Sequence, residues 1–155
     1  MAIIEIEIIL NTDADRVWYE VNRPQLLLFV AWPMIHFMPL DPPDWPERWE
    51  EREYVVSMRL WGILGIGKQV IAISRPTARE GIRYIRDYGR SASISKWDHL
   101  ITVEPGGDRT RYVDRVEIDA GIRTPIVVAF ARRFYAHRQR RWMALVRSGF
   151  EYDVS

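Results

Sequence analysis

Between Glu53 and Asp119 the sequence alternates apolar and polar residues in successive short segments, and turn-forming residues separate these segments. Successive side chains of a strand point to opposite faces of a sheet, so each segment predicts a strand with one buried face. Short turns join antiparallel neighbours, because parallel strands need long crossover connections. The pattern therefore predicts an antiparallel meander. Its expected strands are Glu53–Trp61, Lys68–Ser74, Gly81–Tyr88, Ile94–Glu104 and Arg109–Asp119.

The residues before this meander predict one more strand and two short helices. Ile3–Leu10 alternates with the same period of two, and the polar run Asn11–Asp13 can cap a helix that ends at Pro24. Leu26–Trp32 is expected to form a second short helix. Prolines interrupt the next segment, so Pro33–Trp49 is expected to be mostly loop.

The last third of the chain carries a long helical pattern. Thr124 offers a hydroxyl cap, Pro125 suits the first helical turn, and helical spacing continues to about Ser148. One stripe of this helix is apolar and is expected to cover the sheet. The stripe consists of Val127, Ala131, Phe134, Trp142 and Leu145. The residues expected to lie off it are Arg132, Arg133, Gln139, Arg140 and Arg147.

Together these elements predict an α+β fold, in which a curved antiparallel sheet of about six strands wraps around the long C-terminal helix. Two short helices follow the first strand. The length of 155 residues suits a single domain over residues 1–155, and no repeat or linker divides it. Because one helix cannot fill the whole concave face of such a sheet, we expect an internal cavity.

Composition excludes several kinds of site. The chain has no cysteine, which removes disulfides, thiolate zinc sites and iron–sulfur clusters. The three histidines lie in separate predicted elements, so we expect no metal site, and no motif calls for a cofactor. The glycines between Gly62 and Gly67 lack the lysine–serine ending of a phosphate loop, so a hairpin is the better interpretation.

Charge and hydropathy limit the expected partners and location. The net charge of +1 argues against nucleic acid as a partner, although Arg123–Arg147 carries arginines and no acidic residue. The N-terminal segment lacks the basic start and cleavage site of a secretory signal. The longest apolar run, Leu26–Ile35, is shorter than the roughly 20 residues that cross a bilayer. We therefore expect no membrane span and a cytoplasmic location.

Several short motifs are each weak, but their order and spacing along the chain together indicate a family resemblance. They are Asp13-x-x-x-Val17-Trp18, Leu60-Trp61-Gly62 running to Gly67, Trp97-x-His99, Thr110-x-x-x-Asp114-x-Val116 and Phe134-x-x-His137-Arg138. In these motifs the sequence resembles the START-like, or SRPBCC, superfamily over nearly the whole chain. Its relatives include the birch-pollen allergen type and polyketide cyclases. The resemblance implies a helix-grip fold with a hydrophobic cavity that binds a small apolar molecule, but no particular reaction.

The alternation of two predicted strands places His99 and Asp114 on the inward face. A buried carboxylate needs a cation or several hydrogen-bond donors, and Arg138 on the sheet-facing side of the last helix is the expected partner of Asp114. This pair can be purely structural or can clamp a ligand's carboxylate or carbonyl group. His99 can act as a general acid or base, or can be a hydrogen-bonded wall residue. Tyr84 and Tyr112 can present hydroxyls to the same cavity or fill the core.

The leading hypothesis is that the protein binds a small hydrophobic or aromatic ligand, lipid-like or polyketide-like, in the internal cavity. The expected lining is Tyr54, Val56, Met58, Tyr84, Trp97, His99, Tyr112, Asp114, Phe134 and Arg138. One alternative is a cofactor-independent polyketide cyclase or dehydratase, in which His99 and Asp114 transfer protons. A second alternative is a protein or RNA interaction module that uses the basic C-terminal helix.

Overall fold

The structure is a computed structural model that describes residues 1–153. Strands and helices follow the expected order, with one additional strand. The elements are β1 (Ala2–Leu10), α1 (Ala14–Val21), α2 (Pro24–Ala31), β2 (Ile35–Asp41), β3 (Glu53–Leu60), β4 (Leu64–Ser74), β5 (Arg83–Ser91), β6 (Lys96–Gly106), β7 (Arg109–Asp119), the short 3₁₀ helix η1 (Gly121–Arg123) and α3 (Thr124–Arg147).

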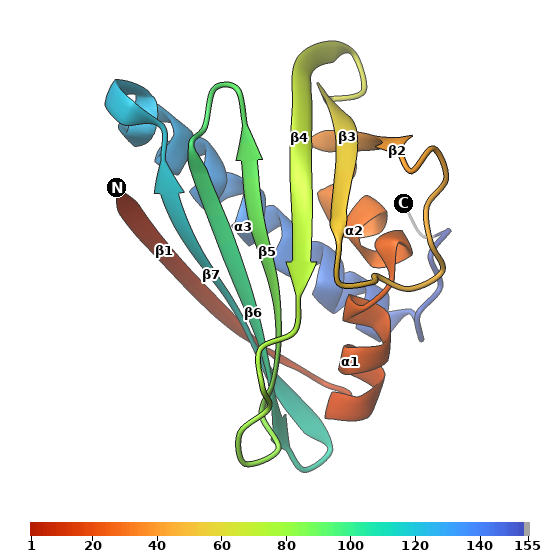
Figure 1. The fold of residues 1–155 in the computed structure, drawn as a ribbon. Helices are drawn as coiled ribbons and strands as arrows, with labels where there is room; N and C mark the ends of the chain where they lie inside the picture. The colour runs from red at the N-terminus through yellow and green to blue at the C-terminus, as the bar shows by residue number, and fades with distance from the viewer. Residues whose placement is uncertain (154–155) are drawn as a thin grey trace.

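One antiparallel sheet of seven strands runs in the order β1-β7-β6-β5-β4-β3-β2. Figure 1 shows this sheet in front of the long helix α3. The short helix α2 contacts α3 and the edge strand β2, and α1 contacts β6 and β7. A curved antiparallel sheet around a C-terminal helix, with two short helices after the first strand, is the helix-grip arrangement that the sequence predicts. Within residues 1–153, no helix is both long and apolar enough to cross a membrane.

The expectation that Pro33–Trp49 is mostly loop is wrong for its first half, where β2 pairs with β3. Ile35 and Phe37 are buried on alternate positions of this strand. Proline lacks the N–H that a central strand needs, but β2 is an edge strand and its register shifts between Pro39 and Asp41. The prolines therefore mark an edge strand with an irregular end and not a continuous loop.

The expected hairpin after β3 is present, and β4 begins earlier than the sequence predicts. Its strand pairing reaches back to Leu64, which lies opposite Leu60 of β3. Gly62 and Gly67 both have positive φ angles, 70° and 101°, which explains why glycine occupies the turn and the irregular position after it.

The start of α3 is at the predicted residue, but its cap is different. The cap position is Arg123, and no side chain caps the first turn. The Thr124 hydroxyl instead donates to the Gly121 carbonyl (2.7 Å) and accepts from the Ala120 N–H (3.0 Å). Thr124 therefore ties α3 to η1 at the end of the sheet.

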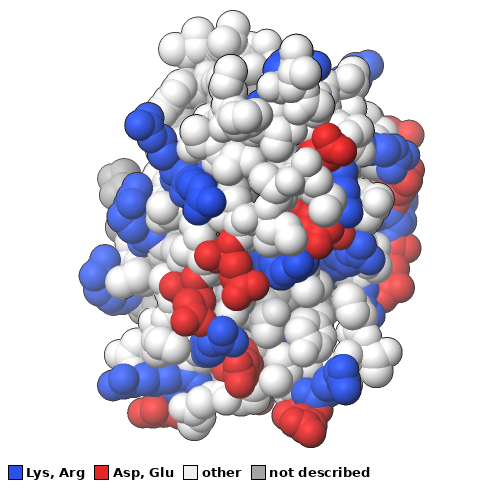
Figure 2. Space-filling view, turned by 90° about the vertical axis from the view of Figure 1, so that its left-hand side faces the viewer, with Lys and Arg blue, Asp and Glu red and all other residues white. Residues whose placement is uncertain are grey.

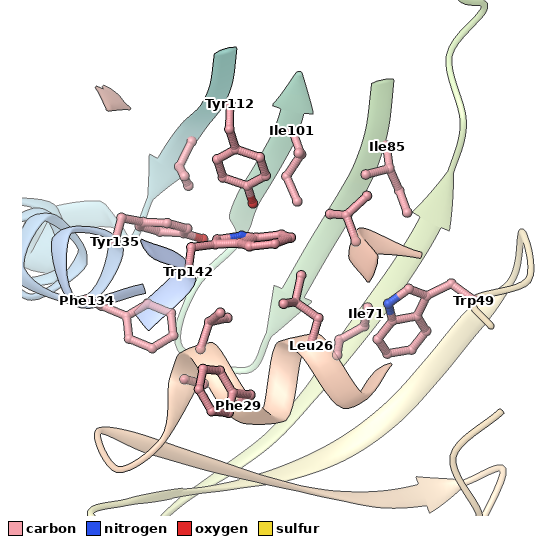
Figure 3. Close-up of a cluster of buried hydrophobic side chains, with 14 of the residues drawn as sticks. Leu26, Phe29, Trp49, Ile71, Ile85, Ile101, Tyr112, Phe134, Tyr135 and Trp142 are labelled. Carbon is pink, nitrogen blue, oxygen red and sulfur yellow. The ribbon is translucent and has the colours of Figure 1, made fainter. Parts of the chain in front are cut away.

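The apolar stripe of α3 forms the centre of the core. Ala131, Phe134, Trp142 and Leu145 are buried as expected, and Figure 3 shows Phe134 and Trp142 between the strands and α2. Gln139 corrects the sequence analysis, since it is buried and not off the stripe. Its amide donates to the Ile6 carbonyl of β1 at 2.8 Å, which satisfies the polar group inside the protein.

We expect Leu145→Ala to lower the free energy of unfolding by about 2–5 kcal/mol, because the fully buried leucine would leave a cavity between α3 and its neighbours. Met143→Ala is the matched control on the same helix, since Met143 is 39% exposed and its loss should cost within about 0.5 kcal/mol. Urea unfolding of both variants measures the difference. Equal costs would contradict the assignment of the buried face of α3.

Candidate functional site

A cavity of about 380 Å³ lies between the sheet and the N-terminal half of α3. Its walls are mainly aliphatic and aromatic side chains from the sheet, α2 and α3. Representative wall residues are Leu26, Ile71, Ile85, Ile101, Phe130 and Phe134. In Figure 3, Ile85 and Ile101 on the strands lie across the core from Phe134 of α3 and Leu26 of α2. The cavity therefore offers an apolar surface to a small molecule.

The charged and amide side chains in the lining are Gln69, Arg86, Asp87, His99 and Arg138. Arg86 is paired with Asp98, and we call the other four the polar wall. Asp87 of β5 and His99 of β6 lie directly opposite each other in the strand register. Directly opposite residues of antiparallel strands have side chains within contact range on the same face. Strand register therefore places Asp87 and His99 side by side in the cavity lining.

His99 forms a buried pair with Asp114 of β7. The His99 Nε2 atom lies 2.7 Å from the Asp114 Oδ1 atom, and Asp114 is only 1% exposed. The Tyr112 hydroxyl donates to the same oxygen at 3.2 Å, and the Gln139 amide donates to the other at 3.1 Å. The carboxylate therefore has donors on both oxygens.

The ionisation of this pair follows from its surroundings. Burial would raise the pKa of Asp114, but the His99 hydrogen bond and the positive charge of Arg138 outweigh it and hold this pKa below the ordinary value. Burial lowers the pKa of His99, although Asp114 opposes the shift. A neutral imidazole beside an ionised carboxylate carries its proton on Nε2, which leaves Nδ1 as the basic nitrogen.

Arg138 lies near Asp114, its expected partner, but no hydrogen bond joins the two side chains. Its Nη2 atom lies 3.9 Å from Asp114 Oδ1, beyond hydrogen-bond distance, because His99 and Tyr112 already occupy that oxygen. The guanidinium lies 5.2 Å from the ring centre of Tyr135. Among residues 1–153 its buried Nε has no hydrogen-bond partner. Arg138 thus brings a positive charge and a free donor to the cavity wall.

Asp87 is a cavity residue that the sequence analysis missed. One of its oxygens accepts the Ala72 N–H at 2.8 Å. Removal from water raises its pKa to about 7, although the Ala72 hydrogen bond and the Arg138 charge oppose the shift. The signal was present in the sequence, because Ile85 and Asp87 are two residues apart on one strand and must share a face.

The other predicted site residues fall into three groups. Met58, Trp97 and Phe134 line the cavity together with His99 and Arg138. Buried next to the cavity, but not lining it, are Tyr54, Val56, Tyr112 and Asp114. Tyr84 corrects the prediction, since it lines a groove on the opposite face of the sheet, where strand alternation places it when Ile85 points inward.

No cluster in residues 1–153 combines three or more His, Asp or Glu side chains in a way that could hold a metal ion. The polar wall has only one histidine and one carboxylate in contact with the cavity. Its groups are suited to hydrogen bonding and proton transfer.

The sequence matches no protein-family model and no curated protein. Solved structures do match. A START superfamily protein from Mycobacterium smegmatis aligns with a TM-score of 0.59 and 12% identity, covering 94% of this chain and 97% of that chain. The Zhui aromatase/cyclase from Streptomyces sp. R1128 aligns with a TM-score of 0.61 and 10% identity, covering 94% and 93%.

Norcoclaurine synthase from Thalictrum flavum, in complex with dopamine and hydroxybenzaldehyde, aligns with a TM-score of 0.64 and 11% identity, covering 95% of this chain and 87% of that chain. At identities this low, the likeness shows the fold alone, and it confirms the helix-grip fold that the sequence resemblance implies. The shared fold does not by itself assign a ligand or a reaction.

The pH dependence of the unfolding free energy should reveal the raised pKa of Asp87. Its folded-state pKa of about 7 lies above the value of about 4 for an unfolded aspartate, so Asp87 favours the folded state at low pH and this contribution is lost as the pH rises from about 4 to about 7. Asp87→Asn cannot ionise. We expect the unfolding free energy of this variant, relative to the wild type, to increase between about pH 4 and pH 8.

Urea unfolding at the two pH values measures this change. Asp108→Asn in the exposed β6–β7 turn is the control for the same substitution at the surface. A difference between Asp87→Asn and the wild type that stays constant with pH would show that Asp87 ionises like a solvated carboxylate.

Proposed function

We propose that this helix-grip protein binds one small apolar or aromatic molecule in the cavity between the sheet and α3. The observation that carries the proposal is a cavity of about 380 Å³ whose lining is mainly apolar and includes only a few polar side chains. Cavities of roughly 300–1,000 Å³, apolar except for a few placed polar groups, are typical small-molecule sites. Burial of the ligand's apolar surface would supply most of the affinity.

The polar wall defines what the bound molecule should carry. Arg138 and Gln69 offer N–H donors, and Asp87 offers a carboxyl group that donates when protonated and accepts when ionised. A carbonyl or phenol oxygen on an otherwise apolar or aromatic body matches these groups. The norcoclaurine synthase structure, which holds dopamine and hydroxybenzaldehyde, supports this class because both compounds are small aromatics with oxygen substituents.

Native mass spectrometry of freshly purified protein, followed by denaturing extraction, tests for a retained ligand, and 2-naphthol titration tests the cavity directly. We expect Val127→Trp to weaken 2-naphthol binding by roughly tenfold or more, because Val127 lines the cavity and tryptophan would fill part of it. Ala129→Trp is the matched control, since Ala129 is exposed on the same helix and does not line the cavity.

Loss of naphthol binding in both variants would indicate a general effect on the helix and not cavity blocking. Unchanged binding in Val127→Trp would place the ligand elsewhere and overturn the proposal.

A second candidate function is acid–base catalysis on a bound carbonyl compound, and the opposed Asp87–His99 pair on the cavity wall favours it. A carboxyl group with a pKa of about 7 is matched to proton transfer near neutral pH. Ionised Asp87 would remove a proton from the carbon next to the carbonyl. The C–H electron pair would form the enolate, whose oxygen would accept from Arg138, and Asp87 would return the proton to carbon.

This reaction predicts deuterium uptake by an enolisable aryl ketone, such as 2-tetralone, in deuterated buffer containing the protein. We expect Asp87→Asn and His99→Gln each to lower the protein-dependent exchange on the order of a hundredfold, because each removes a group on the polar wall. Tyr84→Phe, on the opposite sheet face, should leave the rate unchanged. Exchange that persists in both cavity variants would remove catalysis from consideration and leave ligand binding intact.

A further inference from the structure

Large apolar side chains are exposed around one end of the molecule. The tip of the β3–β4 hairpin exposes Trp61, Ile63 and Leu64, and the start of α3 with the preceding η1 exposes Ile126 and Ile122. Ile63 is 84% exposed and Ile122 is 99% exposed, so these residues project into solvent and contribute little to the core. Such exposed patches mark interaction sites more often than scattered single residues do.

These residues border the opening of the cavity. Ile66, which follows the hairpin tip, and Ile126 both line the cavity and are also exposed, at 41% and 75%. The Trp32 ring packs next to the hairpin tip, since a Cβ atom placed on Gly62 would lie 3.9 Å from this ring. The apolar surface therefore continues from the outside of the molecule into the cavity. We call the exposed set Trp32, Trp61, Ile63, Leu64, Ile66, Ile122 and Ile126 the rim.

Basic side chains lie near the rim, and few acidic side chains do. Arg59 and Lys68 flank the hairpin tip, and Arg123 and Arg133 lie in η1 and on the Ile126 side of α3. None of these four residues forms an ion pair within residues 1–153. The nearby Asp119 accepts the Gly121 N–H at 3.0 Å.

The sequence around the rim contains no acidic residue from Arg59 to Lys68 or from Ala120 to Phe150. Figure 2 shows the consequence on one face. Acidic side chains gather in the middle and lower parts, and charge thins out toward the top, which is the end where η1 and the β3–β4 hairpin lie in Figure 1.

We propose that the rim docks on an anionic lipid bilayer, with its apolar side chains in the headgroup boundary and its basic side chains against acidic lipids. Exposed Trp, Leu and Ile beside Lys and Arg are the combination that binds membrane interfaces. Nucleic acid offers no apolar phase for Ile63 and Ile122, and aliphatic anchors are less typical of protein interfaces than Tyr and Arg. Docking does not depend on the proposed ligand, but it would let the cavity open toward the bilayer.

Co-sedimentation with vesicles tests the proposal on the intact protein. We expect binding to vesicles of phosphatidylcholine with about 30 mol% phosphatidylglycerol, and weaker binding to phosphatidylcholine alone. Ile63→Ser combined with Leu64→Ser should lower the vesicle affinity by roughly tenfold or more. Both residues are exposed at the hairpin tip and outside the cavity wall, so 2-naphthol binding should be retained.

Ile9→Ser is the matched apolar control, because Ile9 is 56% exposed at the end of β1 next to α1, away from the rim (Figure 1). Lys68→Gln with Arg133→Gln should weaken binding to the anionic vesicles, and Arg147→Gln at the other end of α3 should not. No binding to anionic vesicles, or an equal loss in the Ile9 variant, would overturn the proposal. Salt-sensitive capture of RNA in place of vesicles would also overturn it.

Discussion

The rest of the interior depends on the hydrogen bonds that the buried carboxylate of Asp114 accepts. An ion removed from water costs several kcal/mol unless the protein supplies donors and opposite charge. Here the hydrogen-bond donors come from three elements, with His99 on β6, Tyr112 on β7 and Gln139 on α3. The positive charge comes from Arg138, whose Nη2 atom lies 3.9 Å from the Asp114 carboxylate. Because Gln139 also donates to β1, the same cluster fixes how α3 lies along the sheet.

The cavity follows from where α3 is held. The helix packs against β1 and β7, whereas the strands on the other side of the curved sheet face it across open space. Small side chains do not cause this opening. It results from one helix meeting a concave sheet that is wider than the helix. His99 and Arg138 each have two roles here. They lie next to the Asp114 carboxylate, and they also line the cavity.

This arrangement has consequences for how the polar wall can work. A hydrogen bond to Asp114 holds His99, so this imidazole is positioned before any ligand enters, and the Arg138 guanidinium lies near the same carboxylate. Asp87 stands apart from that cluster, with one hydrogen bond from Ala72 and the Arg138 charge nearby. Its proton is therefore the one most open to change by a ligand or by pH.

Local periodicity determined most of the architecture. Alternation over Arg109–Asp119 and helical spacing after Thr124 are properties of neighbouring residues, so they predicted the strands, the long helix and the inward positions of His99 and Asp114 without any knowledge of the fold. The edge strand at Ile35–Asp41 escaped prediction because prolines are excluded only from central strands, and edge position is a property of the whole sheet. Only the tertiary structure decided that His99 and not Arg138 is hydrogen-bonded to Asp114, that Gln139 is buried, and that Asp87 lies opposite His99 in the strand register. Strand register and helix placement bring these residues together from distant parts of the chain, and no local pattern contains that information.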